Sequence, residues 1–201
     1  MKIIEPSVEL MRDFDGAEVM KFLETCGRTA YQSEKNITAD SAEKFVRNLI
    51  KREHESVLEH FSATFKIICD RGVMAEITRH RLASFTIEST RFNAYKELTF
   101  IAAPKFVIHY VDDYRKFFER AEKLYKRALK QGLSPEQARS ILPNSLKTEI
   151  VMTANLRELR HILKLRTAKD AHPQMRQIAN MILEILKEKL PVVFEDIGNE
   201  K

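Results

Sequence analysis

The sequence has few of the residues that build the commonest cofactor and metal sites. Only five of its 201 residues are glycine, and it has no glycine-rich loop, which excludes the usual dinucleotide and P-loop fingerprints. The two cysteines, Cys26 and Cys69, stand alone without metal-type spacing. We interpret them as small buried hydrophobic residues of a protein in the reducing cytoplasm. Neither has a histidine near it in the sequence, so no thiol nucleophile with a matched base is evident.

Long apolar runs and long basic runs are also absent. No segment approaches the length of apolar residues needed to cross a bilayer, and residues 1–10 carry no cleavable signal pattern. We therefore expect no membrane partner. The net charge is +5 with a pI near 9.1, and the arginines are dispersed among mixed segments. This distribution favours discrete anion pockets, while a basic nucleic-acid-binding protein stays open as an alternative class.

Hydrophobic periodicity predicts an α+β fold in which a small mixed sheet combines with long helices, in a single domain that spans residues 1–201. The predicted strands are residues 1–10 (an edge strand interrupted by Pro6), 61–69, 98–104 (stopped by Pro104) and 146–154. Five of the predicted helices are residues 16–30, 72–82, 111–131 (closed by Gly132), 155–165 and 173–190. A further helix is capped by Asp40 or Ser41 and reaches Ile50, and another begins at Ser134 and is ended by Pro143.

The segment RHRLASFTIESTRF (79–92) concentrates arginines and hydroxyl side chains. Arginine is suited to planar, bidentate recognition of phosphate and carboxylate groups. Arg79 and Arg81 lie two residues apart, so on a regular element they face different ways, toward two ligands or two subunits. Ser89 and Thr90 supply short hydroxyl donors beside Arg91, as a phosphate site requires. The alternative is an exposed, turn-rich segment whose counter-ion is a neighbouring glutamate.

Two further segments carry histidine. In HESVLEH (54–60) the two histidines lie six residues apart, which does not match the i, i+4 spacing of helical zinc sites, so we predict no metal. In NLRELRHILKLR (155–166), Arg157 and His161 are i, i+4 neighbours and Arg166 stands at the far end. Asn155 is the expected N-cap. A surface helix with basic residues in its last turn is the alternative here.

Taken together, these segments resemble the flavin-dependent thymidylate synthases. Arg79-His80-Arg81, seven residues, and then Ser89-Thr90-Arg91 resembles the long signature of that family. The segments HESVLEH, RGVMAEITRHR, ARSILP, NLRELRHILKLR and AHPQMR also match family segments in the same order. The resemblance extends over residues 26–190.

The resemblance implies an α+β homotetramer whose sites lie between subunits. It implies FAD as cofactor, NADPH as reductant, and methylenetetrahydrofolate as carbon donor for the methylation of deoxyuridine monophosphate to thymidylate. In that chemistry the hydride comes from reduced flavin and no enzyme cysteine acts as nucleophile. The partners would be the mononucleotide and the folate, with neither nucleic acid nor membrane.

Carried over by position, the resemblance implies two sets of ligand contacts. The FAD contacts would be Ser56, Arg79, His80, Arg81, Ile87, Asn155, Arg157 and His161. The nucleotide contacts would be Glu76, Arg79, Glu88, Ser89, Thr90, Arg91, Arg139 and Arg166. Arg166 would be the catalytic residue, because a fixed cation beside N3 of the uracil stabilises the charge that develops as C5 becomes nucleophilic.

The main departure from the family pattern is at Ile87, with milder ones at Thr86 and at His161, where some members have Asn. The family commonly has Gln or Glu where this chain has Ile87. Isoleucine packs but cannot hydrogen-bond to a flavin or a nucleotide. This change leaves a second alternative within the same scaffold, namely a related flavin-dependent enzyme that acts on another pyrimidine nucleotide.

Overall fold

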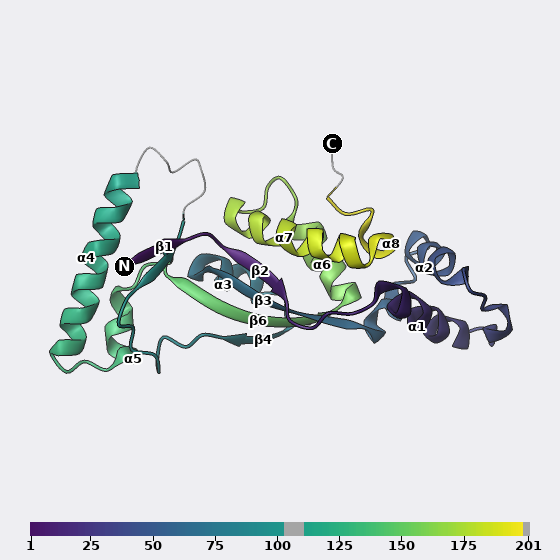
Figure 1. Cartoon of the computed structure of the whole chain (residues 1–201), viewed down its shortest axis with the longest axis horizontal. Coiled ribbons are helices and arrows are strands. Elements are labelled where there is room, and N and C mark those ends of the chain that lie inside the picture. Colours follow the sequence, from purple (N-terminus) through teal and green to yellow (C-terminus); the bar gives the residue numbers. More distant parts are fainter. Residues whose placement is uncertain (103–110, 199–201) are drawn as a thin grey trace.

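The computed structural model describes residues 1–102 and 111–198 of the chain (Figure 1). The strands are β1 (Lys2–Ile4), β2 (Ser7–Leu10), β3 (Ser62–Asp70), β4 (Ser84–Ile87), β5 (Thr99–Ile101) and β6 (Lys147–Asn155). The α-helices are α1 (Gly16–Thr29), α2 (Ser41–Lys51), α3 (Arg71–Ile77), α4 (Val111–Lys130), α5 (Pro135–Ala138), α6 (Leu156–Arg166), α7 (Pro173–Lys189) and α8 (Pro191–Phe194). Short 3-10 helices are η1 (Glu34–Asn36), η2 (Glu55–His60) and η4 (Arg139–Ile141).

The larger sheet is antiparallel, with strand order β2-β3-β6-β4. Its two long strands pair over their whole length, from Ser62 opposite Asn155 to Asp70 opposite Lys147. Alternate residues of both strands are buried, because successive side chains point to opposite faces of a sheet. In Figure 1 the helices α6, α7 and α8 lie together on one side of this sheet.

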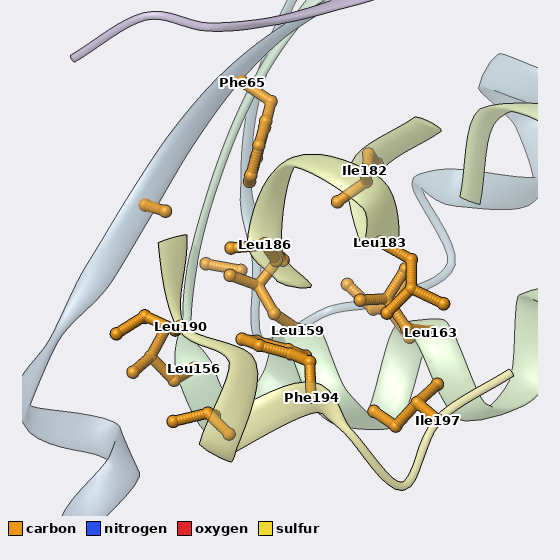
Figure 2. Packing of buried hydrophobic residues seen from close by; sticks show 14 of the residues in the cluster. Phe65, Leu156, Leu159, Leu163, Ile182, Leu183, Leu186, Leu190, Phe194 and Ile197 are labelled. Atoms are coloured by element: carbon orange, nitrogen blue, oxygen red, sulfur yellow. The ribbon is translucent and has the colours of Figure 1, made fainter. Parts of the chain in front are cut away.

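The main core lies between this sheet and those helices. Figure 2 shows Leu159 of α6, Leu186 of α7 and Phe194 of α8 packed together, with Phe65 of the sheet nearby. All four side chains are fully buried. Because burying a side chain of this size contributes about 1.5–3 kcal/mol, this layer contributes strongly to stability and holds α6 in place against the sheet.

A second, smaller cluster supports the other end of the molecule. Strands β1 and β5 form a two-stranded parallel sheet, and α4 packs against it. The rings of Phe100 and Phe118 stack with centroids 4.2 Å apart, and Tyr125 is fully buried beside them. Among the described residues, no helix is long and apolar enough to span a membrane.

The predicted α+β class is confirmed, with the strands divided between two small sheets. The chain is interrupted at Pro6 as predicted, but β1 and β2 then enter different sheets. The helix predicted over 72–82 is wrong beyond Ile77, because the backbone turns there and β4 begins at Ser84. Neither β4 nor α8 was predicted from the pattern. The predicted stop at Pro104 lies outside the described residues.

Candidate functional site

The predicted site residues fall into three groups along the larger sheet. β6 is nine residues long, so its two ends are separated by roughly 25 Å. One group lies where β6 passes into α6, and another lies beyond the opposite end of β6. The third lies between them, where α6 has run back over the sheet and its last residue meets the turn after α3.

The central group is built around the guanidinium of Arg166. Its Nε donates to Nε2 of His80 at 3.0 Å. Its terminal nitrogens donate to a carboxylate oxygen of Glu76 at 3.3 Å and to the carbonyl oxygen of the same residue at 3.4 Å. Three predicted site residues, which are up to 90 positions apart in sequence, are therefore in direct contact.

His80 is a neutral imidazole in this arrangement. Its side chain is only 6% exposed, and burial, with further contributions from Arg166 and His161, lowers its pKa to about 4. Because Nε2 accepts from the guanidinium, the ring proton sits on Nδ1. That nitrogen lies 3.8 Å from a carboxylate oxygen of Glu158, whose pKa is raised by burial.

The group at the start of α6 lines a cleft of about 650 Å³. Asn155 caps the helix by accepting from the backbone N–H of Glu158 at 2.9 Å, as the sequence predicts. Arg157 and His161 both line the cleft one helical turn apart. Arg157 is exposed and pairs with Glu59 of η2 at 2.5 Å. The remaining lining residues are Glu55, Leu82, Glu158, Arg160 and Lys164.

η2, which carries the exposed Ser56, is attached to the rest of the site by a buried arginine. The Arg160 side chain is 1% exposed. It donates to Glu55 at 3.0 Å, to both carboxylate oxygens of Asp196 at 2.7 and 2.8 Å, and to the carbonyl oxygen of Val193. This side chain therefore connects η2, α6 and the segment after α8.

The group at the opposite end of β6 lines a pocket of about 230 Å³. Arg139 donates to the buried Thr90 hydroxyl at 3.4 Å. Arg71, which sequence analysis did not single out, also lines this pocket, and its buried Nη1 has no hydrogen-bond partner. A buried donor left without a partner is costly and calls for an explanation such as a bound ligand. The signals for Arg71 in the sequence are its position two residues after the predicted strand 61–69 and at the start of the family-like segment RGVMAEITRHR.

Two other predicted nucleotide contacts are held by protein partners. Arg91 forms an exposed ion pair with Glu136 at 3.1 Å, and its backbone N–H donates to the Ser89 hydroxyl. Both carboxylate oxygens of Glu88 are occupied, one by Lys147 at 2.9 Å and one by the hydroxyl of Tyr95 at 2.8 Å. Glu88 is thus suited to fixing the turn after β4.

The signature segment also presents unpaired and apolar groups at the surface. Arg79 and Arg81 are exposed, and within residues 1–102 and 111–198 neither side chain forms a hydrogen bond or an ion pair. Leu82 and Phe92 are 79% and 80% exposed. Ile87 pairs with Ile150 across the sheet and is half-buried against the main core. Free cations next to exposed apolar side chains provide a surface for an anionic ligand or a second chain.

Comparison with known proteins gives consistent matches. The family model described as thymidylate synthase complementing protein matches residues 13–192. A flavin-dependent thymidylate synthase of Pyrococcus furiosus is 34% identical over 172 residues, which cover 81% of this chain and 70% of that protein. A probable flavin-dependent thymidylate synthase of Mycobacterium phage L5 is 31% identical over 202 residues, covering 92% and 82% of the two chains.

A solved structure has the same fold. The crystal structure of a UMP/dUMP methylase PolB from Streptomyces cacaoi, bound with 5-Br dUMP, superposes with a TM-score of 0.84. The two sequences are 24% identical, and the match covers 97% of this chain and 96% of that one. At this identity the match supports the architecture described above.

Proposed function

The chain belongs to the family of flavin-dependent thymidylate synthases, which are methyltransferases, and we propose that it methylates deoxyuridine monophosphate to thymidylate. Methylenetetrahydrofolate would be the carbon donor and NADPH the reductant. The observation that carries the proposal is the arrangement of a cleft, an anchored guanidinium and an arginine pocket along one sheet. We assign these three parts to the flavin, the uracil and the nucleotide phosphate, in that order.

The cleft at the start of α6 fits a flavin with a pyrophosphate group. Arg157 and His161 lie on its wall, and Arg157 can exchange its exposed partner Glu59 for a phosphate oxygen because exposed ion pairs contribute little. We propose that Asn155, Arg157 and His161 hold FAD in this cleft, with further contacts from Ser56, Arg79, Arg81 and Ile87, as the resemblance implies. When bound, reduced FAD supplies the hydride for the reaction.

The arginine pocket fits the phosphate of the nucleotide. Arg71 and Arg139 face it together with the Thr90 hydroxyl, and arginine–phosphate contacts are charge-assisted and frequently bidentate. Ser89 and Arg91 stand beside this pocket in the turn after β4. Arg71 begins α3, and Glu76 stands near its end, so a nucleotide lying along α3 would direct its uracil toward Arg166.

The chemistry proposed for Arg166 is electrostatic. A fixed cation beside N3 of the uracil stabilises negative charge as the proton leaves and the ring becomes nucleophilic at C5. An enzyme thiolate is not needed for this step. Cys69 fits that view, because burial raises the pKa of its thiol to about 12 and so keeps it protonated.

We propose a homotetramer with shared sites. Arg79 appears in both ligand sets implied by the resemblance, as expected where one residue stands between two ligands. The exposed Leu82 and Phe92 flank the signature arginines, and a second chain would cover them.

The first test is the visible absorbance spectrum of the purified protein with FAD, before and after deoxyuridine monophosphate is added. We expect a bound-flavin spectrum that shifts when the nucleotide binds. Bound flavin with no shift would favour another pyrimidine nucleotide, to be checked with uridine monophosphate in the same titration. No bound flavin would contradict the proposal and favour a basic nucleic-acid-binding protein, whose affinity for nucleic acid falls steeply with salt.

Replacing Arg71 by alanine should weaken nucleotide binding by about 10- to 100-fold, because a hydrogen bond between charged groups contributes about 1.5–3 kcal/mol. Flavin affinity should change less than twofold. Titration of both ligands, followed by fluorescence, measures this directly. Arg120→Ala is the matched control, since Arg120 is exposed on α4 and its loss changes the net charge equally. Equal nucleotide affinity in the two variants would exclude Arg71 from the phosphate pocket.

A further inference from the structure

We infer that His80 is a positioning residue that holds the guanidinium of Arg166 in its reactive orientation, in place of the direct flavin contact that the family resemblance implies. The inference rests on the proposed function, because it concerns how the residue beside the uracil is oriented. It begins from the contact between Nε of Arg166 and Nε2 of His80 at 3.0 Å.

The donors of Arg166 can be counted. A guanidinium has five N–H groups in one plane. The single Nε–H points to His80, and one N–H on each terminal nitrogen points to Glu76. Two N–H groups remain, one on each terminal nitrogen. With three of the five N–H groups held, the plane is fixed, so the two remaining donors have a fixed direction and are the ones available to a uracil.

The His80 ring is positioned to accept a hydrogen bond and is poorly placed to contact a ligand. Its backbone N–H donates to the carbonyl of Ile77 at 3.2 Å, and its own carbonyl accepts from Ala83 at 3.2 Å, which fixes the turn between α3 and β4. Its side chain is 6% exposed, so little of the ring can touch FAD. His161, whose ring centroid lies 5.9 Å away, is exposed and lines the cleft.

The groups around the ring keep it in the accepting form. Arg166 lies on the Nε2 side, and Glu158 faces Nδ1 at 3.8 Å. A protonated ring would have no lone pair for the guanidinium and would place two cations in contact. The ring therefore performs this task only while it is neutral, with its proton on the side of Glu158.

The test compares two amide substitutions of similar polarity. The amide oxygen of His80→Gln reaches the position of Nε2, whereas that of His80→Asn reaches only the position of Nδ1. We expect His80→Asn to lower kcat by about 10- to 100-fold with the flavin dissociation constant within twofold of wild type. His80→Gln should recover most of kcat. Circular dichroism and thermal melting verify that both variants fold.

A double-mutant cycle with Arg166→Ala decides the mechanism. If His80 acts through Arg166, then His80→Asn has no further effect on kcat in the Arg166→Ala background. Additive losses, equal activity of the Asn and Gln variants, or a flavin affinity weakened tenfold or more would overturn the inference. If the wild-type protein binds flavin and nucleotide but the variants do not behave as expected, only the positioning role of His80 is refuted. Wild-type protein without either ligand refutes the proposed function and this inference together.

Discussion

Replacing Arg166 by alanine is expected to lower kcat by about 10²- to 10³-fold while flavin binding and the melting temperature change little. The lost interaction is made chiefly as charge develops on the uracil, so it affects the transition state more than the bound ground state. A single preorganised donor at such a position is typically worth about 2.7–4 kcal/mol. The side chain is partly exposed, so its removal leaves no large cavity.

The measurement is steady-state turnover with deoxyuridine monophosphate, together with KM and flavin content for the same preparations. Arg166→Lys is the informative companion, because it keeps the charge but lacks the planar group that both His80 and Glu76 hold. We expect an intermediate loss for lysine. Arg120→Ala serves again as the control for charge and should behave as wild type. Normal turnover in Arg166→Ala would remove this residue from the proposed mechanism.

The parts of the fold that follow local rules could be predicted from the sequence. Alternation in 61–69 and 146–154 predicts the two long strands, because each has one face on the core. Asn155 caps α6 as expected, and Ser134 begins α5 with a capping box. Gly132 follows α4 with φ of +90°, a conformation that favours glycine.

The site could be predicted only in part, since its contacts are long-range. The signature arginines and the pair Arg157–His161 are evident as motifs, and the structure places the latter on one cleft. By contrast, the bond between His80 and Arg166 joins residues 86 positions apart, which no local pattern encodes. Arg71 was missed for a similar reason. Only the fold shows that its buried nitrogen lacks a partner beside Arg139.

Arg160→Met is expected to lower the free energy of unfolding by about 2–4 kcal/mol. Removing one member of a buried ionic group typically costs about 3–5 kcal/mol, because the partners lose their compensating charge. The expected loss of unfolding free energy is smaller here, because Glu55 and Asp196 are 20% and 44% exposed and water can solvate them. Chemical denaturation at neutral pH measures the change. The loss should be accompanied by weaker flavin binding, since the same side chain holds η2 against α6.

Two comparisons separate this effect from loss of an ordinary surface charge. Arg47→Met removes an arginine that pairs with Glu195 where both side chains are about half exposed, and such pairs contribute at most about 1 kcal/mol. Equal losses for Arg47→Met and Arg160→Met would contradict a special role for Arg160. Combining Arg160→Met with Glu55→Gln and Asp196→Asn removes the uncompensated charges and should recover stability but not flavin affinity. That outcome follows because neutral side chains no longer repel one another, yet the buried link from Arg160 to Glu55 of η2 is still missing at the wall of the cleft.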